Sequence, residues 1–168
     1  MKRLVYFLAI NFLIIPSILV AITPNVVYAD EIEDLKLEKQ LVNPDSFYYP
    51  AKRYIENLQN MFMFSKDSKV NLHKNLLKKR ASELKYIVED RVLSELERGS
   101  QRFAYQAGIL VEEAEKDYTE QGKKEIKDQF SKYKKLLDQL RENFKANSSF
   151  WMLIQQDIDT LDILSEKI

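Results

Sequence analysis

Apolar residues recur every three or four positions along most of the second half of this chain. The clearest run lies between residues 123 and 145, where this spacing places one stripe on a single helix face. Its members are Ile126, Phe130, Tyr133, Leu137, Leu140 and Phe144. Three other segments carry similar stripes: Leu77, Ala81, Leu84 and Val88; Phe103, Ala107, Leu110, Ala114 and Tyr118; and Ile154, Ile158, Leu161 and Ile168. We therefore predict an all-α protein, an antiparallel bundle of four to five helices.

Helix-start residues and chain breakers set the expected boundaries of these helices. Pro50 suits the first turn of a helix, where a missing N–H costs nothing, and Ser65 or Asp67 can cap the next helix. The expected helices lie near residues 50–63, 66–97, 100–120, 123–146 and 149–166.

Glycine and a polar tripeptide mark the expected joints between the long helices. Gly99 and Gly122 each follow one periodic segment, and Asn147-Ser148-Ser149 separates the last two. Each suits a left-handed helix stop or a new N-cap. Gly108 falls inside an expected helix, where we predict that it permits close approach of a neighbouring helix.

The first 29 residues have the layout of a secretory signal peptide. Lys2 and Arg3 precede an apolar run from Leu4 to Ile22, and Val27-Tyr28-Ala29 offers a small-residue cleavage site. We predict a signal peptide over 1–29, an acidic and loosely structured approach over 30–45, and a helical bundle domain over 46–168. The alternative is an uncleaved membrane anchor, because the apolar run approaches spanning length. Either reading predicts an extracytoplasmic location, secreted or in the cell envelope.

Charge and cysteine content narrow the class of protein. Without the leader the chain has 24 basic and 26 acidic side chains, and this near-neutral balance argues against a nucleic-acid partner. The chain has no cysteine, so neither disulfides nor thiolate metal sites can form. Stability must come from packing.

A cluster of motifs between residues 42 and 84 carries a family resemblance. It consists of Asn43-Pro44-Asp45-Ser46-Phe47-Tyr48-Tyr49-Pro50-Ala51-Lys52-Arg53, then Phe62 and Phe64, Lys69, Leu72-His73, and Arg80 to Glu83. This pattern resembles a bacterial exported helical domain family of unknown function. The resemblance implies a helical fold and an exported or membrane-attached location. It implies no activity, because the family has none established.

The motif has a structural and a binding interpretation. Pro44, Asp45 and Ser46 favour a turn, and Pro50 begins a helix. In the structural interpretation, the rings of Phe47, Tyr48 and Tyr49 lie across the long helix that carries Leu72 and His73, and Lys52 and Arg53 pair with neighbours such as Glu56. In the other, the aromatic residues form a ligand or peptide groove, and Lys52 and Arg53 contact an anionic partner.

Two further features have a structural and a functional interpretation. The run Met61-Phe62-Met63-Phe64 is expected to be buried at a helix end, with a partner surface as the alternative. The stripe with Phe150 and Trp151 either closes the bundle or zips against a second copy as a coiled coil.

His73 is the only histidine, and it is expected to be partly buried and bonded to a backbone carbonyl or to a tyrosine hydroxyl near Tyr48. A lone imidazole makes neither a catalytic triad nor a metal site.

No constellation for catalysis, cofactor binding or metal binding is present in the sequence. Carboxylates such as Glu112, Glu113, Glu115 and Asp117 lie among lysines, and phosphate loops and nucleophile elbows are missing. The sequence predicts a non-catalytic interaction or scaffold module that binds an unknown protein or its own copy, and reaches a membrane only through an uncleaved leader. The alternatives are an extracytoplasmic ligand-responsive or stress-responsive sensor, or a chaperone.

Overall fold

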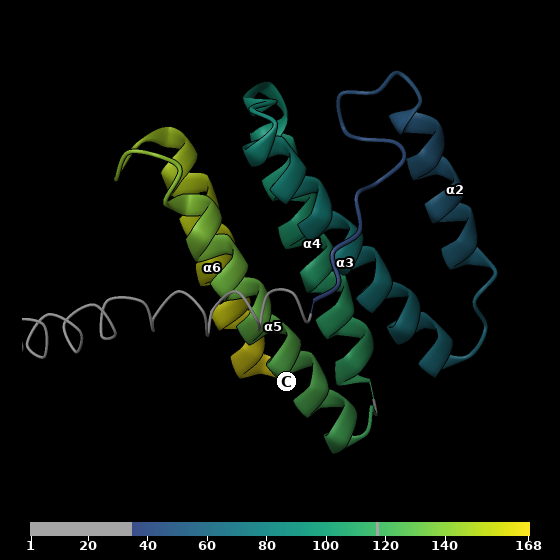
Figure 1. Ribbon diagram of the computed structural model, residues 1–168. Coiled ribbons are helices and arrows are strands. Elements are labelled where there is room, and N and C mark those ends of the chain that lie inside the picture. The colour runs from purple at the N-terminus through teal and green to yellow at the C-terminus, as the bar shows by residue number, and fades with distance from the viewer. Residues whose placement is uncertain (1–34, 117) are drawn as a thin grey trace, which may run out of the picture. The chain divides into compact units, whose positions relative to one another are not determined.

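Five α-helices make up the part of the chain that the structure, a computed structural model, describes: residues 35–116 and 118–168. They are α2 (Tyr49–Met61), α3 (Lys66–Glu89), α4 (Leu96–Glu115), α5 (Glu120–Arg141) and α6 (Ser149–Lys167), with a short 3₁₀ helix at Leu93–Glu95 (Figure 1). No strand occurs among these residues. The predicted all-α fold is confirmed. The predicted leader lies outside the described residues, as do residues 30–34 of the acidic approach.

Helices α3 to α6 form the packed bundle. Helix α3 lies against α4, α6 lies against both α4 and α5, and α3 meets α5 on the remaining side. The four predicted stripes supply the interior, with only Tyr118, Phe144 and Ile168 left partly exposed at helix ends. Phe103 of α4 meets Tyr133 of α5 edge to face, with 5.9 Å between ring centroids. Apolar burial at the stripes therefore holds these four helices together.

Serine and threonine side chains cap three of the helices. The hydroxyl of Ser65 accepts a hydrogen bond from the Ser68 amide at 3.2 Å, and Ser148 accepts one from the Trp151 amide at 3.3 Å. Thr119 caps α5 in the same way through the Gly122 amide at 3.1 Å. Each contact satisfies a donor that the helix cannot pair itself.

Two predicted joints are displaced from the observed ones. The helix expected over 66–97 ends at Glu89, and Arg91 adopts a left-handed φ of 59° in the turn that follows. Gly99 lies inside α4, where a Cβ atom would come within 2.7 Å of Ile87 Cδ1. Gly122 lies in the first turn of α5 against the ring of Tyr118. At both positions the missing side chain makes room for a neighbour rather than stopping a helix.

Gly108 contradicts the expectation of close helix approach. A Cβ atom at this position would meet nothing within 4 Å, so the glycine only loosens the middle of α4. We expect Gly108→Ala to raise the free energy of unfolding by about 0.5–1 kcal/mol, because alanine restricts the unfolded chain and favours the helix. Urea denaturation followed by circular dichroism measures this change, and a loss of stability would contradict it.

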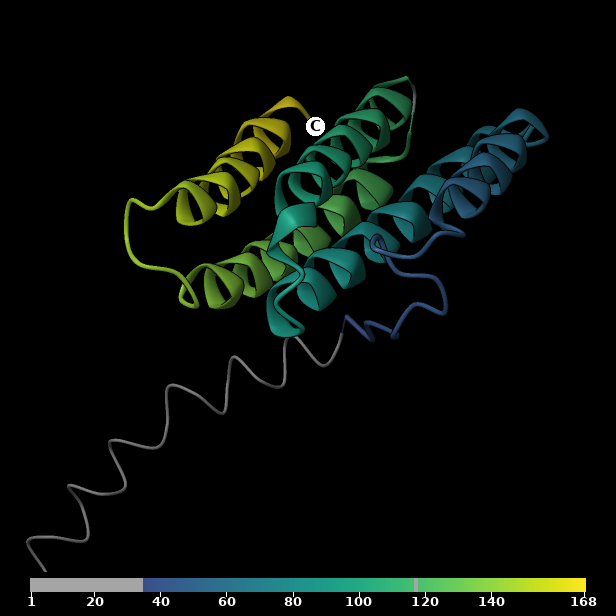
Figure 2. The ribbon, with the colours of Figure 1, turned by 90° about the horizontal axis from the view of Figure 1, so that it is seen from above.

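Helix α2 lies outside the four-helix bundle. Figures 1 and 2 show it at one edge, beside α3, with α6 at the opposite edge. Only Tyr49 and Glu56 are buried among its residues, whereas α3 buries nearly half of its own. None of the described helices combines the length and apolar character needed to cross a bilayer. Apolar burial therefore contributes little to the attachment of α2 to the bundle.

Candidate functional site

A buried cluster of charged side chains attaches α2 to α3. Arg80 of α3 lies at its centre, and its Nη1 donates to Glu83 Oε2 at 2.6 Å and to the Tyr49 hydroxyl at 2.9 Å. Its Nη2 pairs with Glu56 of α2. Lys52 Nζ reaches Glu83 Oε1 at 2.7 Å, and the Tyr49 hydroxyl donates to Glu83 Oε2 at 2.8 Å. We call Tyr49, Lys52, Glu56, Arg80 and Glu83 the charge cluster.

Opposite charges offset the cost of burying this cluster. Burial opposes ionisation of Glu83, but Arg80 and Lys52 outweigh burial and hold the pKa of Glu83 below its ordinary value. Burial also works against the charge of Arg80, yet Glu83, Tyr49 and Glu56 raise the pKa of its guanidinium. The pKa of Tyr49 is raised, first by burial and then by Glu83. The charges of the cluster therefore compensate one another, and its side chains hold α2 against α3.

The remaining cations of α2 and α3 extend the same attachment. Arg53 Nη1 lies 3.0 Å from Glu56 Oε2, so the predicted pairing of Arg53 with Glu56 is confirmed. Lys79 lies 3.8 Å from the other oxygen of Glu56, Oε1, which has no hydrogen-bond partner. Arg102 of α4 stacks over the Tyr49 ring at 5.0 Å. Three helices thus meet around Tyr49.

The outward face of α2 is apolar. At 100° per residue, an arc of about 140° opposite Tyr49 and Glu56 contains no charged or amide side chain. We call this surface the apolar arc; its members are Tyr48, Ala51, Tyr54, Ile55, Leu58, Met61 and Phe62. All of them are exposed except Leu58, which is half-buried. Helix α2 thus turns its charged face inward and its oily face outward.

Aromatic side chains extend the apolar arc beyond both ends of the helix. Phe47 is 92% exposed before α2, and Phe64 is 90% exposed after it. The expectation that Met61-Phe62-Met63-Phe64 is buried at a helix end is wrong, because Met61 and Phe62 are 73% and 68% exposed and Met63 is only half-buried. The rings of Phe47 and Tyr48 also fail to cross the long helix as predicted, and only Tyr49 does so.

A groove runs along one flank of the apolar arc. It encloses about 430 Å³ between α2, the segment before it and α3, and its apolar lining comes from Val42, Tyr48, Ala51 and Ile55. Lys52, Glu56, Gln59 and Lys79 complete the lining. The predicted motif residues are therefore split: Tyr49, Pro50, Lys52 and Arg53 fix the helix, whereas Tyr48, Phe62 and Phe64 are left exposed.

His73 lies in the interface between α3 and α4, away from the Tyr48 turn. Its Nδ1 lies 2.9 Å from the side-chain amide nitrogen of Gln106, which corrects the expected bond to a carbonyl or a tyrosine hydroxyl. Burial lowers the pKa of His73, so the neutral ring accepts the amide hydrogen. This ring is 3% exposed. His73 is a satisfied interior residue and does not contribute to the exposed surface.

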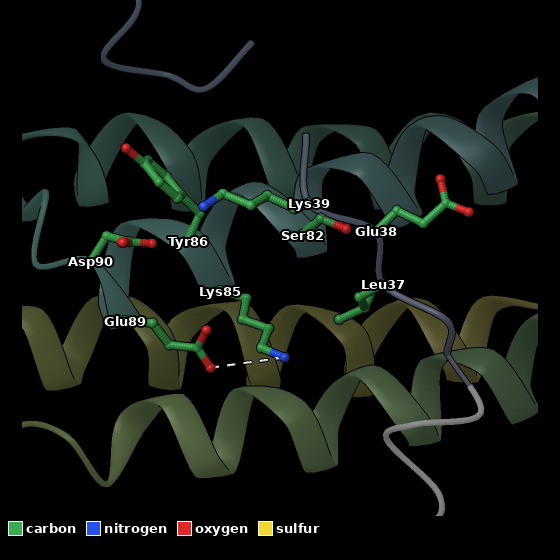
Figure 3. A pocket seen from close by; sticks show the side chains of 8 residues that line it. All are labelled: Leu37, Glu38, Lys39, Ser82, Lys85, Tyr86, Glu89 and Asp90. Carbon is green, nitrogen blue, oxygen red and sulfur yellow. Dashed lines mark ion pairs between the residues drawn. The ribbon is translucent and has the colours of Figure 1, made fainter. Parts of the chain in front are cut away.

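A second hollow shows no convergence of reactive groups. It measures about 190 Å³ between the segment 37–39 and the end of α3, and Figure 3 shows its side chains pointing in different directions. Lys85 and Glu89 pair with each other at 3.8 Å. Within the described residues, no three acidic or histidine side chains are placed to hold a metal ion.

Asp157 is a buried acid that the sequence analysis missed. It lies in the α6 stripe between Ile154 and Ile158, is 1% exposed, and its Oδ2 has no hydrogen-bond partner. Burial raises its pKa to about 8, partly opposed by a hydrogen bond with Ser100. The sequence feature that could have indicated a buried acid was its position within the apolar stripe of this helix.

Asp157 makes the stability of the fold depend on pH. The unfolded chain loses this proton near the ordinary pKa of 3.8, whereas the folded chain keeps it to about 8. Its contribution to the free energy of unfolding therefore falls as pH rises through that window, by up to about 1.4 kcal/mol per pH unit. We expect Asp157→Asn to match the parent near pH 4 and to be clearly more stable at pH 8. Equal stabilities at pH 8 would contradict this assignment.

Comparison with known families places the chain in one of them. Residues 41–159, more than two thirds of the chain, match the family described as a domain of unknown function (DUF5667). The chain belongs to this family. The matched region begins just before the turn that precedes α2 and ends within α6, so it contains the charge cluster and the whole apolar arc. No curated protein and no solved structure matches the chain.

Proposed function

We propose that this DUF5667 domain is a non-catalytic interaction module that works outside the cytoplasmic membrane, and that the apolar arc is its docking surface. The observation that carries the proposal is the orientation of α2. Helix α2 buries its charged face, which is costly, and this orientation leaves its apolar side chains in water. The attachment therefore lacks the hydrophobic stabilisation that burial of those apolar side chains would give. A second surface that covers the arc would recover that stabilisation.

The attachment of α2 also supports a role in docking. Salt bridges and hydrogen bonds from Arg80 fix the rotation of α2 about its own axis, because only one face of the helix carries Glu56 and Tyr49. A helix fixed in this way presents its side chains in one arrangement before binding, which lowers the entropy lost on association. The leader pattern at residues 1–29 supports placing this surface outside the cytoplasm.

Thiol masking tests the proposal in the cells that make the protein. The chain has no cysteine, so Ile55→Cys adds a unique thiol in the arc, and Glu112→Cys adds a control thiol on the exposed face of α4. We expect a membrane-impermeant maleimide to modify both purified proteins equally. In the intact envelope we expect Ile55→Cys to react at least tenfold more slowly than the control. Equal rates in the envelope would refute the docking role.

A further inference from the structure

We propose that the surface which covers the apolar arc is an anionic lipid membrane. This inference rests on the docking role proposed above and names the occupant. It is carried by the coincidence of exposed aromatic side chains with a strongly basic segment of the chain.

Charge is distributed unevenly along this protein. The segment 46–80, which contains the arc, has eight lysines and arginines against two acidic residues, a net charge of +6 in a chain whose total is zero. Two carboxylates from outside the segment also pair with it: Glu83 with Lys52 and Arg80, and Glu125 of α5 with Lys74. Counting them with Glu56 and Asp67, four carboxylates face eight cations and leave a net charge of +4. Lys52 and Lys79 line the groove that adjoins the arc. An anionic surface is the complementary partner.

The same charge disfavours a second copy as the occupant. Two protomers joined through their arcs would bring two segments of +6 together, and like charges facing each other across an interface are destabilising. A homodimer through α2 would also need acidic rims, which neither flank of the helix provides.

The form of the arc fits a lipid interface better than a protein pocket. Phe47, Phe62 and Phe64 project from the two ends of α2 with most of their surface in water, while Tyr48 and Tyr54 have exposed rings with polar tips. Helices that lie in the headgroup region have this composition, with aromatic and aliphatic residues on one face and lysines and arginines at its borders. An α2 of 13 residues would lie flat, since it is too short to span.

Vesicle co-sedimentation tests the inference. The probe is the chain from Asp30 onward, because the leader would itself bind lipid; residues 35–168 form a compact unit with the whole described core. The vesicles are phosphatidylglycerol with phosphatidylcholine, or phosphatidylcholine alone. We expect at least tenfold stronger binding to the anionic vesicles, and a several-fold loss at 0.5 M salt.

Matched variants place the binding surface. We expect Phe62→Ser with Phe64→Ser to weaken binding at least tenfold, and Lys79→Gln, in the groove beside the arc, to weaken it several-fold. Tyr105→Ser with Ile163→Ser removes two exposed apolar side chains outside the arc and is expected to bind as the parent does. All these positions are at least partly exposed, and unchanged circular dichroism would show that the variants fold.

The outcomes separate this inference from the docking role. Absence of binding to anionic vesicles, or equal binding by the Phe62 and Phe64 variant, overturns the lipid assignment. If the Ile55→Cys thiol is nevertheless masked in the envelope, a protein covers the arc and the docking role stands. If that thiol is not masked, the docking role itself fails.

Discussion

Arg80→Ala is expected to release α2 from the bundle. The substitution removes the buried cation that Glu56 and Glu83 share, and leaves them only the less buried Arg53, Lys79 and Lys52 as partners. Removing one member of a buried ion pair costs up to about 3–5 kcal/mol. Helix α2 buries little else, so undocking and hydrating both carboxylates is the less costly state. Hydrogen exchange followed by mass spectrometry should show α2 amides exchanging as in an unprotected peptide, while α4 to α6 keep their protection.

Two further variants make this test specific. Arg98→Ala removes an exposed arginine that pairs with Glu95 at 3.2 Å, and it should change stability by less than about 0.5 kcal/mol. Replacing Lys52, Glu56, Arg80 and Glu83 together with Met, Met, Met and Leu, and Tyr49 with Phe, should restore docking, because an apolar contact needs no compensating charge. Retained protection of α2 in Arg80→Ala would show that the charge cluster is not what holds the helix.

Phe103→Ala is expected to lower the free energy of unfolding by about 3–5 kcal/mol. The ring is completely buried and meets Tyr133 edge to face, so its removal leaves a cavity between α4 and α5. Urea denaturation should show the loss as a lower midpoint. Unlike Arg80→Ala, this variant should weaken α3 to α6 together and leave no part of the bundle selectively protected.

Tyr105→Ala is the control on the same helix. Its ring is 67% exposed, and its loss should change stability by no more than about 0.5 kcal/mol. If Phe103→Ala cost as little as Tyr105→Ala, the bundle interior would not be formed by the stripe that contains Phe103.

The bundle was predictable because its helices follow one rule throughout. In α5, each residue from Ile126 to Leu140 at four-three spacing is buried, and the polar positions between them are exposed or half-buried. Serine and threonine caps were partly readable as well, since Ser65 and Ser148 precede their helices directly. The roles of the glycines could not be predicted. A glycine that ends a helix and a glycine that makes room for a neighbouring side chain such as Ile87 are indistinguishable in sequence.

The orientation of α2 was not predictable from periodicity. Its pattern contains two faces, one with Ile55 and Leu58 and one with Lys52 and Glu56, and the usual rule sends the apolar face inward. The opposite result depends on Arg80 and Glu83, which stand in the middle of the α3 stripe between Leu77 and Leu84. Opposite charges at these core positions were the sequence feature that could have indicated a buried charge cluster. If the cluster holds the charged face of α2, the apolar arc must face outward.

Hydroxyl-radical footprinting of the purified chain tests the central claim most directly, because it reads side-chain exposure without any substitution. In this structure the charged face of α2 holds the helix against α3, and its apolar face is exposed to solvent. Tyr48, Tyr54 and Phe62 should then be oxidised rapidly, whereas Tyr49 should be protected as well as Tyr133. Protection of Tyr54 and Phe62, together with rapid oxidation of Tyr49, would mean that the helix is turned the other way.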